Sequence, residues 1–334
     1  MMAMKKFLND PENLVQELLD GFALANANTI RLAGSNLVVR ATPKPANKVA
    51  LVTLGGSGHE PALSGFVGEG MLDISVPGEI FAAPGPPRVI EALRMANREA
   101  GVLFIVLNHA GDVMSAEVAM EMAAKEGLNV EMVLTHEDIS AGTREDPSER
   151  RGLAGCLAVI KAAGAAAEQG KSLAECTAIA VRMERNLGTL AVAVQGATHP
   201  ATGDVIATVD EGVMVVGMGQ HGEAGGGTQP LKTADETAAI MADALIDDLG
   251  LERGEKVLAI INGVGSTTLM EQYVVLRAVK KHLAAKGIDA VRCIAGEFLT
   301  VQEMAGFQMI LGRLDDELLA LWDAPCHCPA LSRK

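Results

Sequence analysis

Aromatic side chains are scarce in this 334-residue sequence, which contains seven Phe, one Tyr and one Trp. Proteins that read bases by stacking need aromatic platforms, and a net charge of -14 further opposes binding to nucleic acid or to anionic membranes. No apolar run approaches the roughly 20 residues of a membrane span, and the first residues contain no signal-peptide core. We therefore expect a cytoplasmic protein that binds neither nucleic acid nor membranes.

Cysteine is also rare, and its odd number, five, cannot form a complete set of disulfides. Cys156, Cys176 and Cys293 lie in apolar or helical surroundings, where reduced cysteines commonly pack. The Cys-His-Cys run at 326–328 has some ligand character but lacks a second ligand pair at zinc spacing. We expect structural packing there, no bound metal, and a reducing compartment.

The sequence is rich in alternating strand and helix patterns, with 49% apolar residues. Continuous apolar runs over residues 48–54 and 102–107 are typical of strands covered on both faces. The alternation predicts an α/β fold of two domains, 1–185 and 186–334, with largely parallel or mixed sheets. Helices are expected from residue 10 and over residues 86–99, 116–126, 151–168, 234–249 and 269–286. Further strands are expected at 130–134, 189–194, 213–216 and 256–261, and near Val291, Met309 and Leu319.

A glycine loop at 55–60 follows the first buried strand and contains His59. Ligands of open α/β sheets bind at the carboxyl ends of the strands, and glycines let backbone N–H groups approach a small ligand. The loop is not a phosphate-binding P-loop, because no Gly-Lys-Ser/Thr follows, and it lacks the dinucleotide spacing. His59 either works as an acid, base or hydrogen-bond donor, or it is a solvated residue of a tight turn.

Asp112 ends the loop after the second buried strand. A carboxylate there can take a proton from a substrate hydroxyl, and it can equally cap a helix that begins near Ala116.

His221 lies in the glycine-rich segment 217–227. A histidine in an ordinary core does not need glycines on both sides. A histidine that must reach a ligand where the backbone is crowded does need neighbours without side chains. A neutral imidazole adds to carbonyl carbons when a neighbour such as Glu223 fixes its tautomer. The alternative is a flexible glycine loop without a function.

Six ordered motifs along the chain resemble the substrate-binding subunits of the dihydroxyacetone kinase family, from about Asn9 to Leu331. They are Gly55-Gly-Ser-Gly-His-Glu-Pro61, Pro77-Gly-Glu-Ile-Phe81, Gly111-Asp112, Arg151-Gly-Leu-Ala-Gly155, Gly219-Gln-His-Gly-Glu223 and Leu321-Trp-Asp-Ala-Pro325.

The resemblance implies a role for each matched residue. His221 forms a hemiaminal with the ketone, His59 stabilises the adduct, and Asp112 is the base for the terminal hydroxyl. Gly56, Ser57 and Gly58 line the substrate. A covalent link through the carbonyl selects ketones and aldehydes over polyols such as glycerol.

The resemblance also implies partners. The family's nucleotide-binding helical domain is not present in this sequence, so we expect ATP, or ADP recharged by a phosphotransferase-system protein, to sit with Mg on a separate helical subunit. No cofactor is expected on this chain, which is expected to form a homodimer.

Two residues depart from the family pattern. Leu107 stands where the family usually has Lys, and His109 stands where it has Tyr. Because pocket contacts set specificity, a four-carbon ketose such as erythrulose is an alternative substrate to dihydroxyacetone. A non-catalytic ketose-sensing co-regulator is a further alternative, although such a protein has no need of the base Asp112.

Overall fold

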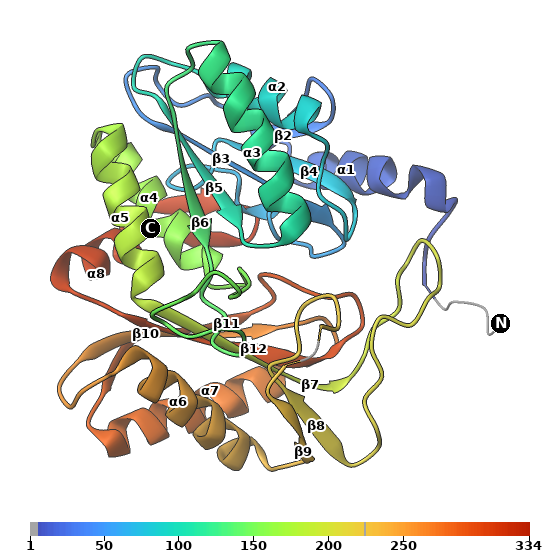
Figure 1. The fold of residues 1–334 in the computed structure, drawn as a ribbon, viewed down its shortest axis with the longest axis vertical. Helices are drawn as coiled ribbons and strands as arrows, with labels where there is room; N and C mark the ends of the chain where they lie inside the picture. The colour runs from blue at the N-terminus through green and yellow to red at the C-terminus, as the bar shows by residue number, and fades with distance from the viewer. Residues whose placement is uncertain (1–5, 224) are drawn as a thin grey trace.

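The computed structural model describes residues 6–223 and 225–334, which form two lobes, each built on a six-stranded sheet. Helices lie outside each sheet and also between the two sheets (Figure 1). No helix in the described part of the chain is both long and apolar enough to cross a membrane. The α/β class with mixed sheets predicted from the sequence is confirmed.

The first sheet belongs to the N-terminal lobe. Its strands are β1 (Ile30–Ala33), β2 (Leu37–Arg40), β3 (Ala50–Ser57), β4 (Ile74–Ile80), β5 (Val102–Leu107) and β6 (Val130–Thr135). They lie in the order β1-β2-β4-β3-β5-β6, and the pairs β4–β3, β3–β5 and β5–β6 are parallel. Helices α2 (Pro86–Ala96) and α3 (Ala110–Lys125) pack on its outer face. Burial on both faces explains why β5 is continuously apolar and β3 nearly so before its glycines.

The second sheet is mainly antiparallel, which differs from the largely parallel sheet that the strand and helix alternation suggested. Its strands are β7 (Leu187–Gln195), β8 (Val213–Val216), β9 (Gly227–Pro230), β10 (Lys256–Gly263), β11 (Asp289–Gly296) and β12 (Ala305–Arg313). Their order is β11-β10-β12-β7-β8-β9, and only β10 and β11 run parallel. Helices α6 (Ala234–Leu249) and α7 (Leu269–Lys286) cover the outer face.

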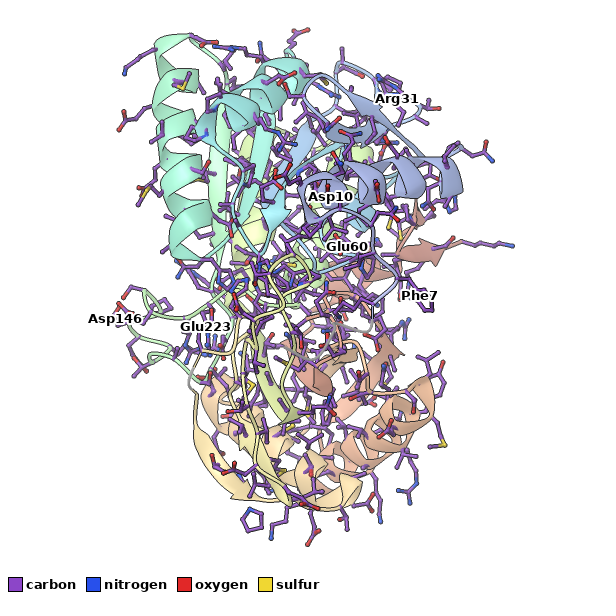
Figure 2. The ribbon with its side chains drawn as sticks, turned by 90° about the vertical axis from the view of Figure 1, so that its right-hand side faces the viewer. Phe7, Asp10, Arg31, Glu60, Asp146 and Glu223 are labelled. Carbon is purple, nitrogen blue, oxygen red and sulfur yellow. The ribbon has the colours of Figure 1, made fainter. Side chains whose placement is uncertain are left out.

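The N-terminal segment joins the two lobes (Figure 2). Asp10 accepts a hydrogen bond from the backbone of Glu12 and so caps the first turn before α1 (Leu14–Ala25). Lys6 forms an ion pair with Glu303 of the C-terminal lobe. The cap at Asp10 confirms the predicted start of a helix at that residue.

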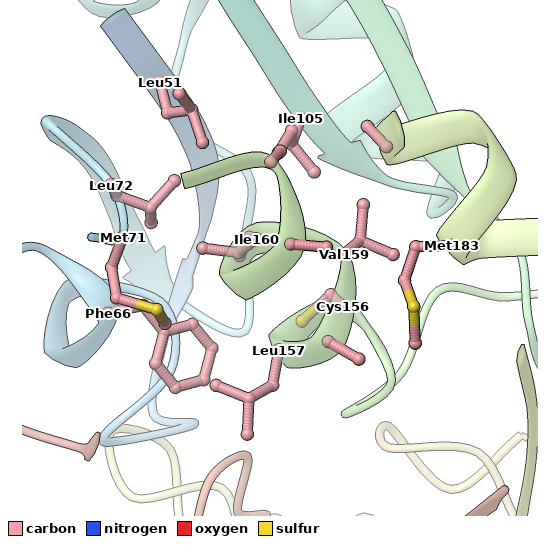
Figure 3. Packing of buried hydrophobic residues seen from close by; sticks show 14 of the residues in the cluster. Leu51, Phe66, Met71, Leu72, Ile105, Cys156, Leu157, Val159, Ile160 and Met183 are labelled. Carbon is pink, nitrogen blue, oxygen red and sulfur yellow. The ribbon is translucent and has the colours of Figure 1, made fainter. Parts of the chain in front are cut away.

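A helical layer fills the space between the two sheets. Its helices are α4 (Cys156–Glu168), α5 (Leu173–Arg185) and α8 (Asp316–Asp323). Ile160 of α4 packs in the same core as Leu51 of the first sheet (Figure 3). Ile310 of the second sheet belongs to that core as well. Small residues permit this close packing, because a Cβ at Gly164 would lie 2.8 Å from the Cα of Met71. The predicted boundary at 185/186 falls between α5 and β7.

Several expectations about elements were wrong in detail. Leu319 lies in α8 and not in a strand, because its apolar run is one face of a short helix rather than an alternating strand. The helix expected from residue 116 begins at Ala110, and the one expected from residue 151 begins at Cys156. In β13 (Cys326–Cys328), which pairs with β14 (Leu331–Arg333), both cysteines are buried and His327 is exposed.

Candidate functional site

A small cavity lies where loops after β3, β5 and β8 meet at the junction of the lobes. Its volume is about 30 Å³, which leaves room for two or three water-sized groups at about 10–15 Å³ each. His59, Asp112 and His221 all line it, together with Gly56. The structure therefore brings together four of the predicted site residues. Figure 2 shows Glu223, the neighbour of His221, at the level where the lobes meet.

Glu223 fixes the tautomer of His221. Its Oε1 lies 3.1 Å from His221 Nδ1, and its Oε2 accepts the backbone N–H of His221 at 2.8 Å. Burial acts to raise the pKa of Glu223, but the hydrogen bonds that it accepts, chiefly from the His221 side chain, outweigh burial and hold that pKa at about 2. An ionised carboxylate can only accept, so Nδ1 of His221 carries a proton, and in the neutral ring the lone pair is then on Nε2.

His59 reaches the cavity from the opposite side. Its Nδ1 lies 2.8 Å from the carbonyl oxygen of Thr300, which can only accept, so His59 also has its proton on Nδ1. Burial, followed by the nearby His221, lowers the pKa of His59 to about 3 and keeps the ring neutral. The Nε2 atoms of His59 and His221 are 3.2 Å apart. This is hydrogen-bond distance, so a proton shared by the two rings, or the hydroxyl of a bound ligand, can lie between these nitrogens.

Asp112 lies in the first turn of α3. Its side chain does not cap the helix, because residue 109 is the N-cap and makes no side-chain capping bond. Oδ1 of Asp112 is buried and has no hydrogen-bond partner in the described part of the chain. Burial raises the pKa of Asp112 to about 7, although His221 acts in the opposite direction. A carboxylate with a free oxygen and a pKa near neutrality is suited to general base catalysis.

The three consecutive residues predicted to line the substrate differ in their surroundings. A Cβ on Gly56 would lie 2.8 Å from the backbone nitrogen of Ala82, so only glycine fits at this wall of the cavity. Ser57 does not line the cavity with His221, and its hydroxyl donates to the carbonyl of Gly78 at 2.7 Å. Gly58 has a φ of 99°, which favours glycine, and its backbone N–H donates to Glu60.

The remaining wall of the cavity is apolar. Leu54, Leu63, Leu107 and Leu299 line it. Leu107, at the end of β5, is 4% exposed, so no charge stands where the family usually has Lys. The polar side chains that line the cavity and could bind a ligand are His59, Asp112, Gln220 and His221.

Sequence reasoning did not assign three side chains beside His221. The ring of Phe81 lies 4.8 Å from His59 and 5.7 Å from His221, and its φ of 55° is unusual for a side chain of this size. The amide nitrogen of Gln220 lies 2.9 Å from His109 Nε2. No sequence signal reports a backbone angle, but the glycine-rich neighbourhood of Gln220 could have drawn attention to it.

His109 approaches both His221 and Glu223. The three side chains offer ligand atoms within 4.8 Å of one another, and within residues 6–223 and 225–334 they form the one such group of three. His109 Nε2 also lies 2.8 Å from the carbonyl oxygen of Gly152, and burial lowers the pKa of His109. The Cys-His-Cys run at 326–328 gathers no such group.

Residues 20–330 match the family model described as the Dak1 domain. The chain therefore belongs to the Dak1 domain family, which confirms the family predicted from the sequence motifs. It is 38% identical to the PTS-dependent dihydroxyacetone kinase, dihydroxyacetone-binding subunit DhaK, of Lactococcus lactis, with 95% of each chain covered.

Other relatives are kinases of dihydroxyacetone or erythrulose, or a co-activator. The chain is 36% identical to an L-erythrulose kinase of Pectobacterium atrosepticum, with 99% of this chain and 56% of that protein covered. Among solved structures, the dihydroxyacetone kinase of C. freundii superposes with a TM-score of 0.90 at 30% identity, over 98% of this chain and 60% of that one. The dihydroxyacetone kinase operon co-activator Dha-DhaQ superposes with a TM-score of 0.89 at 28% identity, over 95% and 98%.

Proposed function

We propose that this chain is the substrate-binding subunit of a dihydroxyacetone kinase and that it holds its ketose as a hemiaminal on His221. The observation that carries this proposal is the position of His221, whose Nδ1 contacts Glu223 while its Nε2 lies 3.2 Å from His59 Nε2 at the cavity. A nucleophile with a fixed tautomer beside a second acceptor suits a ketone, which supplies an electrophilic carbon and, after addition, a hydroxyl donor.

The addition step balances with groups of the site and water. His221 Nε2 forms a bond to the carbonyl carbon, and the π electrons of the C=O bond move to its oxygen. That oxygen takes a proton from water, while the imidazolium loses its Nδ1 proton to water by way of Glu223. The new hydroxyl donates to His59 Nε2. Glycerol has no carbonyl carbon and cannot form this bond.

Asp112 serves the second step. It takes the proton of the terminal hydroxyl as that oxygen attacks the transferred phosphoryl group. The phosphate donor is held by a helical nucleotide-binding subunit, as ATP or as ADP recharged by a phosphotransferase-system protein, with Mg. One observation supports a separate donor: a relative covered over 95% of its length is called a dihydroxyacetone-binding subunit.

The test combines binding and turnover. Isothermal titration should detect dihydroxyacetone binding to the purified chain and none to His221→Ala, with glycerol as the negative control. ATP alone should give no phosphorylated ketose, and addition of a helical nucleotide-binding subunit from a related kinase should give it. Dihydroxyacetone phosphorylation by the chain with ATP alone would contradict the two-subunit proposal.

Erythrulose is the second candidate substrate. The uncharged wall at Leu107 supports it, as does 36% identity to an L-erythrulose kinase. The ratio of kcat/KM for erythrulose and dihydroxyacetone decides between the two. The co-activator alternative is less well supported, because Asp112 retains a free buried oxygen that ketose sensing does not require. A His221→Ala variant that still bound ketose and controlled a partner would favour it.

We expect ketose capture to need no metal ion. Nδ1 of His221 and the carboxylate of Glu223 already bind one another, and the reaction requires a free lone pair on Nε2. Treatment with EDTA should leave the affinity for dihydroxyacetone unchanged. A loss of binding that Zn²⁺ restores would instead assign a metal role to His109, His221 and Glu223.

We further propose that two copies pair through the C-terminal lobe, in the cytoplasm. Strand β9 is the edge of its sheet, and beside it lies an apolar groove of about 330 Å³ where Met270 is 72% exposed and Leu231 55% exposed. All five cysteines are free, which fits a reducing compartment. Light scattering should give a dimer for the wild type and a monomer for Met270→Glu. An unchanged mass for that variant would place the contact elsewhere.

A further inference from the structure

Arg151 extends from the segment between β6 and α4 of the N-terminal lobe to the loop that contains His221. Its guanidinium is largely buried, with 12% of the side chain exposed. Nε donates to Asp138 at 2.7 Å, and Nη2 donates to Ser140 Oγ at 2.8 Å and to the carbonyl of Gly217 at 3.1 Å. Asp138 is 1% exposed, so this arginine is held by a buried counter-ion.

The remaining edge of the guanidinium faces Glu223. Nη1 of Arg151 lies 3.8 Å from Oε2 of Glu223. That same oxygen accepts the backbone N–H of His221, and the other carboxylate oxygen contacts His221 Nδ1. A chain of polar contacts thus runs from Asp138 through Arg151 and Glu223 to the imidazole of His221.

Two glycines of the loop leave space for this arrangement. A Cβ on Gly219 would collide with both Nη1 of Arg151 and Oε2 of Glu223, because the residue lies between them. A Cβ on Gly217 would lie 2.6 Å from the Cβ of Ser140. The loop is therefore short of side chains on the side that faces Arg151, not only on the side that faces the cavity.

We propose that Arg151 is a positioning residue, which fixes the orientation and the tautomer of His221 from the opposite lobe. Either nitrogen of a neutral imidazole can carry the proton, and only the form protonated on Nδ1 leaves Nε2 free to attack a carbonyl. Glu223 selects that form only while its carboxylate stays in place. Arg151 donates to the Gly217 carbonyl and attracts the Glu223 carboxylate across 3.8 Å, so it favours this arrangement when the two lobes are joined.

This inference deepens the proposed function, because its effect on ketose binding presumes capture by His221. Its effect on the ligand-free protein does not. The proton on His221 can be read in the absence of ketose from ¹H–¹⁵N correlation spectra of the imidazole nitrogens, with His221 signals assigned by comparison with His221→Ala.

The experiment compares four variants of the full chain. Arg151→Met removes the contacts, and Arg151→Lys retains the charge but cannot reach all of its acceptors at once. Gly219→Ala keeps Arg151 and separates it from Glu223. Arg144→Met is the matched control, since Arg144 also bridges the lobes, through Asp248, without contacting the His221 loop.

We expect Arg151→Met and Gly219→Ala to shift the His221 signals from the Nδ1–H form toward a mixture of tautomers. Their affinity for dihydroxyacetone should fall about 10- to 100-fold, the usual loss when a partner that orients a functional histidine is removed. Arg151→Lys should show a smaller shift of the His221 signals and a smaller loss of dihydroxyacetone affinity than Arg151→Met. Arg144→Met should lower the unfolding temperature and change neither.

Unchanged His221 signals in both Arg151→Met and Gly219→Ala would overturn the proposal. So would an equal change in Arg144→Met, because the effect would then be one of general stability. If the wild type binds no dihydroxyacetone, the proposed function fails, while the tautomer comparison in the ligand-free protein still decides the role of Arg151.

Discussion

Burial sets the protonation of single residues in the cavity. Asp112 has a pKa raised to about 7, and His59 one lowered to about 3, and in both the largest cause is loss of water around the charged form. Each is therefore shifted toward its neutral state. The neutral His59 can accept a hydrogen bond from a hydroxyl group, while Asp112 changes charge close to physiological pH.

Asp112 gives a prediction about pH. Because a base works only when ionised, phosphoryl transfer should fall as the pH drops below about 7 and reach a plateau above it. Asp112→Asn should lower kcat about 10²- to 10⁴-fold, the usual contribution of a general base, and should change dihydroxyacetone affinity little. Rates measured with the nucleotide-binding subunit from pH 5.5 to 8.5 test this. A flat profile through pH 7 would rule out Asp112 as the titrating base.

The elements around the site were predicted with unequal success. The apolar runs of β3 and β5 and the loops after them were recognisable, because burial on both faces leaves a strong pattern. The start of α3 was placed six residues late, since Ala110 and Gly111 resemble a loop. The role of Arg151 was not foreseen, because its partners at 138, 217 and 223 meet only after two lobes pack together. The positive φ of Phe81 has no sequence signal.

Glu137, just after β6, supplies a prediction about stability at the scale of elements. It is buried beside the start of α4, where its Oε1 accepts the backbone N–H of Leu153. Burial raises its pKa to about 8. The folded state therefore holds a proton that the unfolded state releases near pH 4.5, so stability is greatest below that pH and is lost as the pH rises toward 8.

Glu137→Gln should remove much of this pH dependence. The wild type should lose at least about 1 kcal/mol of unfolding free energy between pH 5 and pH 8, or about 1–2 °C in Tm for a chain of this size, and the variant should lose less. Thermal unfolding at both pH values measures this, with the exposed Glu252→Gln as control. A variant as pH-dependent as the wild type would show that Glu137 is ionised in the folded protein.

At the scale of the whole molecule, ion pairs join the two lobes. Asp248, at the end of α6, binds both Arg144 and Arg150 of the N-terminal lobe. Arg150 has only 3% of its side chain exposed, so loss of its counter-ion would leave a charge away from water. The cavity needs residues from both lobes, and these pairs help to keep it assembled.

Asp248→Asn should therefore lower the free energy of unfolding by about 1–3 kcal/mol, less than a fully buried pair because Asp248 and Arg144 are partly exposed. Denaturant unfolding measures the loss. The control is Asp316→Asn, whose pair with Lys256 is exposed and should contribute about 0–1 kcal/mol. Equal effects of the two substitutions would show that the bridge between the lobes adds nothing beyond a surface ion pair.

The covalent bond to His221 can be observed directly by NMR. Protein with ¹⁵N-labelled histidine, mixed with dihydroxyacetone labelled with ¹³C at the carbonyl carbon, should show a tetrahedral carbon signal split by a one-bond coupling to nitrogen. His221→Ala should abolish that signal. Saturable binding of the ketose with no carbon–nitrogen coupling would contradict the covalent mechanism.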